Sequence, residues 1–181
     1  MENKEPDNES LQREWHIVYT NPRAEKKVKT YLDRYEIINY LPLLNIKSKW
    51  SDRWKMVEKP LFTSYLFVRI SYWEEKNKVL MLPGIHHIVF YKGVPATVTQ
   101  EDLDLVDLFV QNYAETLKVQ KHESLQAGKK LEIKHGKFKG KIVEVLEQKN
   151  KFYVVVNLPM MGQTVRAEIQ IEDLGLEELK V

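Results

Sequence analysis

The chain has 181 residues, and its 43% hydrophobic and 30% charged residues are an ordinary globular balance. No apolar run approaches the ~18 residues that a membrane-spanning helix needs, and the acidic, polar N-terminus lacks the apolar core of a signal peptide. Because the chain has no cysteine, disulfides, thiolate metal sites and cysteine nucleophiles are excluded. We therefore expect a protein of the reducing cytoplasm that does not contact membranes.

The positive charge of the chain is local. The formal net charge is only +2, but residues 118–151 hold ten lysines against four glutamates, whereas residues 168–181 hold five acids and one lysine. Any contact with nucleic acid is therefore expected to be confined to particular segments.

The first part of the chain alternates strand and helix patterns. Residues 1–13 are polar and aperiodic, which predicts a disordered tail. A strand is expected over residues 15–19, followed by Asn21 and Pro22 as the N-cap and first residue of an amphipathic helix. Another strand is expected over residues 37–44.

The pattern continues through residue 117. Residues 46–60 interleave basic residues with two tryptophans, which predicts an exposed loop or hairpin tip. Residues 61–70 are the most apolar stretch and predict a strand buried on both faces. A short helix over residues 71–82, a strand over residues 85–91 and a helix over residues 99–117 follow.

Beyond residue 117 the period of the apolar residues becomes two. Residues 118–127 are polar and predict a linker, and several short strands follow, including a hairpin around Lys149 and Asn150. The expected fold class is α+β, with an α/β domain over residues 14–117 and a small β-barrel over residues 128–181.

Two stretches together resemble known domains. The first contains WHIVY at residues 15–19, a helix with Arg23, Glu25 and Lys26, LFTSYLFV at residues 61–68 and LPGI at residues 82–85; it resembles the NGN domain of NusG and its paralogues. The second, LEIKHGKFKGKIV at residues 131–143, resembles a KOW motif with its glycine turn, Phe138 and Gly140.

The resemblance implies both a fold and a mechanism. NGN is an antiparallel sheet flanked by helices, and KOW is an SH3-like barrel of five strands. The NGN domain of such factors binds the clamp helices of the largest RNA polymerase subunit and suppresses pausing or termination, while the KOW domain recruits ribosomal protein NusE or the termination factor Rho. By this resemblance the chain acts as a monomer, with no cofactor and no enzymatic activity.

Two departures from the family pattern favour a specialised paralogue, of the type that prevents termination in capsular-polysaccharide operons. Thr63 and Ser64 stand where the family usually has Pro-Gly, and residues 158–162 read LPMMG where an aromatic residue often lies next to glycine.

The resemblance places polymerase binding at Trp15, Phe62, Tyr65, Pro83 and Gly84. Phe62 and Tyr65 are three residues apart on one predicted strand and would point to opposite faces. Either the rings form an exposed patch that supplies binding energy to polymerase helices, or they fill the core of the domain. The sequence leaves both alternatives open.

A second candidate site suits single-stranded nucleic acid, because cations neutralise phosphates while aromatic rings stack on bases. In the family the neighbouring surface faces upstream DNA and the non-template strand. The alternative is a solvated hairpin whose tryptophans pack onto the sheet. The candidate residues are Lys47, Lys49, Trp50, Arg53, Trp54 and Lys55.

The candidate partner-binding residues of the KOW domain are Lys137, Phe138, Met160 and Met161. The turn with Lys134, His135, Lys137, Lys139 and Lys141 either contacts RNA or is a charged rim that keeps a small domain soluble. The two methionines are either an adaptable docking surface for NusE or a cap on the end of the barrel.

No catalytic or metal-binding pattern is recognised. His86 and His87 are adjacent, so they would lie on opposite faces of a strand and be poor joint ligands. The competing function is that of a KOW-containing RNA-binding or ribosome-associated protein, in which the barrel performs the main role.

Overall fold

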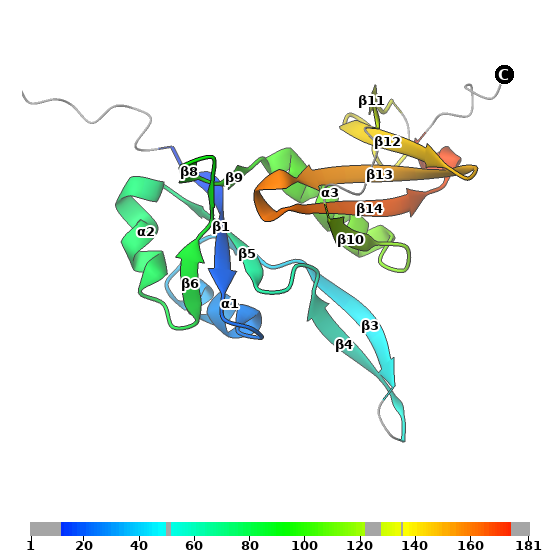
Figure 1. The fold of residues 1–181 in the computed structure, drawn as a ribbon. Coiled ribbons are helices and arrows are strands. Elements are labelled where there is room, and N and C mark those ends of the chain that lie inside the picture. Colours follow the sequence, from blue (N-terminus) through cyan, green and yellow to red (C-terminus); the bar gives the residue numbers. More distant parts are fainter. Residues whose placement is uncertain (1–11, 50–51, 122–127, 135, 175–181) are drawn as a thin grey trace, which may run out of the picture. The chain divides into compact units, whose positions relative to one another are not determined.

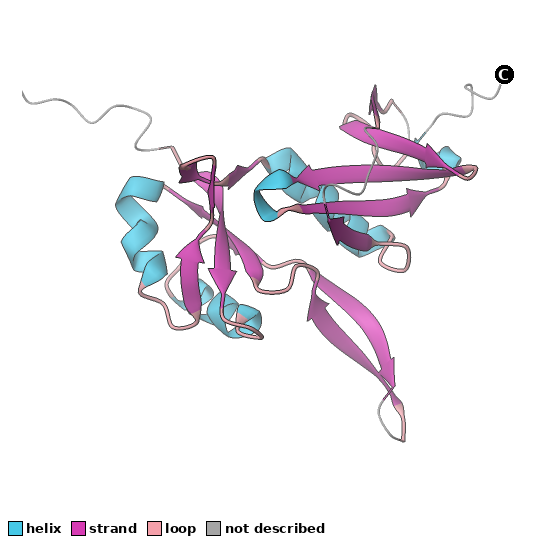
Figure 2. Cartoon of the chain, viewed as in Figure 1, coloured by secondary structure: helices cyan, strands magenta, loops and turns pink. Residues whose placement is uncertain are grey.

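The computed structural model describes residues 12–49, 52–121, 128–134 and 136–174. Helices and strands alternate in an α+β arrangement (Figure 2). The contacts divide the chain into two compact units, residues 1–100 and residues 101–181. Each unit is described by itself.

The first unit is built on an antiparallel sheet with strand order β2-β5-β1-β6 (Figure 1). Strand β1 (Glu14–Thr20) lies between β5 (Tyr65–Ile70) and β6 (Ile85–Ile88), and β2 (Asn39–Tyr40) extends the sheet beyond β5. Strand β9 (Thr97–Val98) also pairs with the start of β1.

Two helices cover one face of this sheet. Helix α1 (Glu25–Arg34) and helix α2 (Tyr72–Leu80) pack against alternate residues of β1, β5 and β6, α1 through Val28 and Leu32 and α2 through Val79. Burial of these aliphatic side chains, at about 1.5–3 kcal/mol each, is the main stabilising contribution to the unit. The core side chains are Val18, Val28, Leu32, Leu66, Val68, Ile70, Val79, Leu82 and Ile88.

A long two-stranded hairpin leaves the sheet between β2 and β5. Strand β3 (Leu43–Lys49) pairs in register with β4 (Trp54–Pro60), and the pair extends away from the rest of the first unit (Figure 1). Of the two forms predicted for residues 46–60, an exposed loop or a hairpin tip, the structure has the hairpin, and it begins earlier, at Leu43. The predicted strand over residues 37–44 is instead two strands, because the chain leaves the β2 ladder at Leu41 and Pro42.

The predicted strand over residues 61–70 begins only at Tyr65. Residues 61–64 form a turn in which Ser64 has a φ of 64°, a left-handed conformation that ends the extended pattern. The turn is held on both sides: the Ser64 carbonyl accepts from the Thr20 amide at 2.9 Å, and the Ser64 amide donates to the buried Glu25 carboxylate at 2.6 Å.

The predicted strand over residues 85–91 is also interrupted. After β6 the chain forms a small hairpin from β7 (Phe90–Tyr91) and β8 (Val94–Pro95). Lys92 and Gly93 both have positive φ, 50° and 84°, which fits the two-residue turn of such a hairpin.

The second unit contains a five-stranded antiparallel sheet with order β10-β14-β13-β12-β11. The predicted hairpin turn at Lys149 and Asn150 is present, with φ of 53° and 59°. The strands are β10 (Lys118–Lys121), β11 (Lys129–Glu132), β12 (Ile142–Gln148), β13 (Lys151–Leu158) and β14 (Gln163–Ile169), with 3-10 turns at Pro159–Met161 and Ile171–Leu174.

Two predicted boundaries are revised. Helix α3 (Gln100–Asn112) is shorter than predicted, and residues 101–112 group with the second unit. The predicted linker does not begin at residue 118, because residues 118–121 form β10 and pair with β14. The remainder of that linker, residues 122–127, and residues 1–11 of the predicted tail lie outside the described residues.

Candidate functional site

The structure buries Phe62, one of the aromatic residues predicted to bind polymerase. Its side chain is only 1% exposed, and its ring packs edge-on against Phe67, with centroids 5.8 Å apart. Phe62 therefore belongs to the core of the unit. This excludes, for Phe62, the alternative that its ring forms part of an exposed aromatic patch. Phe62 lies in the turn before β5 and not on the strand. The strand alternation that placed Phe62 and Tyr65 on opposite faces therefore does not apply.

Tyr65, in contrast, lies on an aromatic surface that crosses three strands. Tyr19 of β1 is opposite Tyr65 of β5 and opposite His87 of β6 in the strand register. The ring centroids are 5.1 Å apart in both pairs, and His86 lies 6.0 Å from Tyr19. Both histidines are exposed and both tyrosines are half-buried. We call Tyr19, Tyr65, His86 and His87 the Tyr-His surface.

Burial favours the neutral forms of two members of this surface, Tyr65 and His87. Burial raises the pKa of Tyr65, and burial together with the neighbouring His86 lowers the pKa of His87. The Nδ1 atoms of His86 and His87 are 2.8 Å apart, so one ring donates to the other. A neutral aromatic surface loses little solvation energy when a partner covers it.

The turn beside the Tyr-His surface needs glycine. Gly84 has a φ of 94°, and a Cβ placed there would be 3.0 Å from the Val28 Cγ2 atom of helix α1. The Gly84 carbonyl accepts from the Asn21 amide at 2.9 Å. Gly84 thus positions the turn, while Pro83 beside it is exposed and available to a partner.

Trp15, the last residue of the predicted polymerase set, is on β1 but four residues before Tyr19. Its side chain is half-buried, and its indole N–H donates to the Gln100 side-chain oxygen at 2.8 Å. Of the predicted set, Tyr65 is therefore part of the Tyr-His surface, Pro83 and Gly84 form the turn directly before β6, and Trp15 lies further along β1. Sequence reasoning missed Tyr19, His86 and His87, because only the cross-strand register brings them to Tyr65.

The predicted nucleic-acid residues lie on the β3–β4 hairpin. On one face Lys47 is opposite Met56 and Lys49 is opposite Trp54, and all four side chains are exposed. Trp54 is 66% exposed, so its ring does not pack onto the sheet as the alternative expected. Lys55 pairs with Ser48 on the other face, and Arg53 is exposed near the tip. Trp50 lies outside the described residues.

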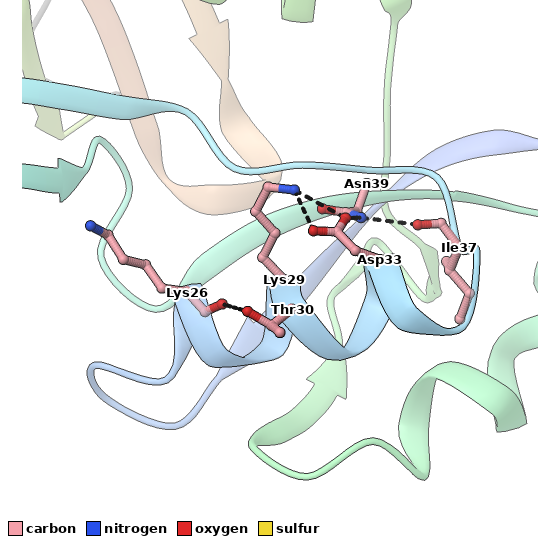
Figure 3. Close-up of polar contacts among 6 residues, drawn as sticks. All are labelled: Lys26, Lys29, Thr30, Asp33, Ile37 and Asn39. Atoms are coloured by element: carbon pink, nitrogen blue, oxygen red, sulfur yellow. Dashed lines mark hydrogen bonds and ion pairs between the residues drawn. The ribbon is translucent and has the colours of Figure 1, made fainter.

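Polar contacts from helix α1 hold the base of this hairpin. Lys26 forms an ion pair with Glu58 of β4 at 3.1 Å. At the end of the helix, the Asp33 carboxylate accepts from Lys29 at 2.8 Å and from Asn39 at 2.7 Å (Figure 3). Hydrogen bonds from Lys29 and Asn39 lower the pKa of Asp33, so the charged carboxylate links α1 to the strand before the hairpin.

In the second unit, the predicted KOW partner residue Phe138 is fully buried. Its ring stacks on Tyr113 at 5.8 Å with an interplanar angle of 23°, and Phe109 of α3 lies 6.2 Å away. We call Phe109, Tyr113 and Phe138 the buried aromatic cluster. Phe138, predicted to bind a partner, therefore does not present its ring at the surface, because Phe109 and Tyr113 cover it.

The other predicted KOW residues also contact their own unit or are at least partly buried. The Lys137 ammonium lies 5.3 Å from the Tyr113 ring centroid and 3.6 Å from the Asp173 carboxylate. The Tyr113 hydroxyl donates to the same carboxylate at 2.8 Å, and burial, that hydrogen bond and the charge of Asp173 raise the pKa of Tyr113. Met161 is buried and Met160 is half-buried.

Across the described ranges, no group of three or more His, Cys, Asp or Glu residues is arranged to hold a metal ion. Within those same ranges, no helix is long and apolar enough to cross a membrane.

Comparisons with known proteins assign the chain to a family through its first part. The family model described as "Transcription termination factor nusG" matches residues 13–107. The chain therefore belongs to the NusG family.

Relatives and a solved structure match over most of the chain. A "Transcription termination/antitermination protein NusG" of Rickettsia felis is 22% identical over 172 residues, covering 87% of this chain and 88% of the relative. The protein of the same name from Chlamydia pneumoniae is 26% identical over 181 residues, covering 91% and 94%. The structure titled "Domain interaction in Thermotoga maritima NusG" is 18% identical, covers 91% of this chain and 97% of that one, and gives a TM-score of 0.49.

Proposed function

We propose that this protein is a transcription elongation and antitermination factor that binds RNA polymerase and acts without enzymatic activity. Membership of the NusG family supports this, as do the curated relatives named as termination/antitermination proteins. Such a factor can shift the polymerase toward one conformation only by the difference between its binding free energies for the two conformations. It would work in the cytoplasm, and the Thr63-Ser64 and LPMMG departures support a specialised paralogue over the housekeeping factor.

The first unit would dock on the clamp helices of the largest polymerase subunit through the Tyr-His surface. The observation that carries this proposal is the contiguous set of rings across β1, β5 and β6. Aromatic side chains at a protein interface contribute most of the binding energy when a partner desolvates them. Elsewhere on the same unit Pro83 is exposed and Trp15 is half-buried, and Phe62 supports the turn before Tyr65 from within.

A binding titration against a purified clamp-helix fragment tests the docking surface. Tyr65→Ala is expected to weaken binding by about tenfold or more, because it removes one of the two large rings of the surface. Tyr35→Ala is the matched control, since Tyr35 is 64% exposed on the same unit and makes no ring contact with the Tyr-His surface. Equal affinities for the two folded variants would contradict the proposal.

We also propose that the β3–β4 hairpin contacts single-stranded upstream or non-template DNA. One hairpin face presents Lys47, Lys49 and Trp54, which supplies phosphate contacts beside a ring free to stack. Neutralising Lys47, Lys49, Arg53 and Lys55 should weaken binding to a labelled oligothymidylate and flatten its salt dependence. Unchanged affinity and salt dependence would count against a DNA contact.

The second unit would be a KOW-type SH3-like barrel that recruits NusE or Rho. Its five antiparallel strands and the Phe138 turn support this. Because Phe138 is covered by Tyr113, a partner would either bind around Met160 and Lys137 or displace the Tyr113 side of the buried aromatic cluster. Binding of purified NusE or Rho to wild-type protein and to Met160→Ala tests the first route.

The alternative, an RNA-binding or ribosome-associated protein, depends on the basic turn between β11 and β12. Two of its lysines are already neutralised: Lys137 by Asp173 at 3.6 Å and Lys141 by Asp104 at 3.7 Å. The polymerase-bound factor is therefore the better-supported function. Co-purification with core polymerase that survives nuclease treatment is the expected result, and loss of every partner on nuclease treatment would favour the alternative.

A further inference from the structure

A second aromatic surface lies on the first unit, on elements different from those of the Tyr-His surface. Tyr72 and Trp73 open helix α2, and Phe90 lies on β7. The ring of Tyr72 is 5.0 Å from that of Trp73 and 6.1 Å from that of Phe90, edge to face in both pairs. With Lys76, one helical turn further on, these residues form what we call the α2 patch.

Trp73 and Phe90 are not part of the core of the unit, although Tyr72 packs against that core. Helix α2 is anchored by Val79, which is fully buried, and by Leu82 just beyond its end. Trp73 is 67% exposed and Phe90 is 54% exposed. Two large exposed rings, each in contact with the ring of Tyr72, are unusual for a free surface and typical of an interaction site.

The charge of the α2 patch comes from Lys76. Its ammonium lies 4.6 Å from the Trp73 ring centroid and 5.0 Å from that of Tyr72, so two aromatic rings hold it in place. The neighbouring Glu75 is directed elsewhere, to Arg13 at 3.1 Å and to the Ser71 amide at 2.9 Å. Among the described residues Lys76 makes no ion pair, although the exposed Glu74 lies on the same helix.

We propose that the α2 patch docks an acidic, amphipathic segment of a partner protein. A partner carboxylate would pair with the Lys76 ammonium, while an apolar side chain would lie against Trp73 and Phe90. Charge complementarity supports this partner, because a cation already ordered on two rings loses little conformational entropy on pairing. The small area of the α2 patch predicts a weak, transient contact.

Nucleic acid fits the α2 patch less well. The faces of Trp73 and Tyr72 toward Lys76 are already covered by the ammonium, so a base cannot stack there without displacing it. A single cation also differs from the hairpin, where Lys47 and Lys49 alternate along a strand at a spacing suited to successive phosphates. The α2 patch therefore favours a peptide.

Fluorescence anisotropy with the full-length protein tests this proposal. The probe is a labelled amphipathic helical peptide of about 18 residues, five turns, with leucine on one face and glutamate on the other. A matched peptide carries lysine in place of glutamate. The wild-type protein is expected to bind the acidic peptide and not the basic one, with an affinity that falls as salt is added.

Two variants and one control locate the contact. Trp73→Ala is expected to weaken binding of the acidic peptide by about tenfold, and Lys76→Gln by about threefold with most of the salt dependence lost. Met81→Ala is the control, because Met81 is 83% exposed at the end of the same helix but outside the α2 patch. It is expected to bind like wild type.

Three results would overturn the proposal. The first is equal binding of the acidic and basic peptides, or no effect of Trp73→Ala in a folded protein. The second is displacement of the peptide by oligothymidylate in a Trp73-dependent manner, which would assign the α2 patch to nucleic acid. The third is a dimer in sedimentation that Trp73→Ala abolishes, which would mean that a second copy of the chain covers the α2 patch. Docking through the Tyr-His surface is measured separately and is unaffected by any of these outcomes.

Discussion

The Tyr-His surface and the buried aromatic cluster are similar in composition and opposite in state. In the first unit, rings from three strands meet across the sheet and leave His86 and His87 exposed. In the second unit, Phe109 and Tyr113 close over Phe138 and exclude water from it. An aromatic cluster is therefore a docking surface only where the chain itself has no element left to cover it.

The largest difference between the two clusters should appear in stability. Phe138→Ala is expected to lower the free energy of unfolding by about 3–5 kcal/mol, because it leaves a cavity beside Phe109 and Tyr113. Tyr65→Ala, at a half-buried position, is expected to cost well under half of that amount. Amide hydrogen exchange in β13 and in β5 of the full-length variants measures the two effects.

Comparable losses of amide protection in Phe138→Ala and Tyr65→Ala would contradict this difference between the two clusters. In that case the rings of the Tyr-His surface would be as important to the fold as Phe138, and its role as a free docking surface would lose its main structural support.

The next largest effect on stability is expected at Gly84, in the turn beside the Tyr-His surface. Gly84→Ala is expected to destabilise the first unit by roughly 1–3 kcal/mol, because alanine disfavours a φ of 94° and its Cβ would press on Val28. All four tryptophans lie within residues 1–100, so tryptophan fluorescence during urea unfolding reports on this unit. Gly93→Ala is a useful control, since φ is 84° there but no atom lies within 4 Å of the added Cβ.

Local sequence signals predicted many of the elements correctly, and tertiary contacts account for most of the errors. The Lys149-Asn150 turn and the basic hairpin were recognised because turn chemistry and alternation are local. Phe62 was assigned to a strand because nothing in LFTSYLFV marks the left-handed Ser64. The burial of Phe138 depends on Tyr113, 25 positions earlier in the chain, which no local pattern reveals. The same holds for Tyr19 and His87, which strand register alone brings together.

Ser64 allows a test in which the expected effect is stabilising. Its φ of 64° suits glycine, the residue that the family pattern usually has at this position. Ser64→Gly is expected to raise the free energy of unfolding by up to about 1 kcal/mol and to preserve the hydrogen bonds to Thr20 and Glu25, which use only the Ser64 backbone. A destabilised variant would show that the buried serine side chain contributes more than the backbone strain costs.

The smallest expected effect is a pH dependence of the stability of the first unit. His16 is 2% exposed; its Nδ1 atom is 3.3 Å from the Ala96 carbonyl, and its Nε2 atom has no hydrogen-bond partner among the described residues. Burial lowers the pKa of His16, so the unfolded chain takes up this proton at a higher pH than the folded chain does. The stability that the first unit has with a neutral His16 is therefore fully present above about pH 6.5. Part of this free energy of unfolding is lost as the pH falls below that value.

Tryptophan-detected urea unfolding at pH 7.5 and pH 5.5 measures this contribution (two conditions chosen about one unit either side of the ordinary histidine pKa). The wild-type midpoint is expected to fall at the lower pH, and His16→Asn should reduce that fall. His87→Asn is the matched comparison, because the pKa of His87 is also lowered but its side chain is exposed, so its share should be smaller. If His16→Asn left the pH dependence unchanged while His87→Asn removed it, the proton-sensitive part of the unit would be the Tyr-His surface, and polymerase docking itself should then weaken in acid.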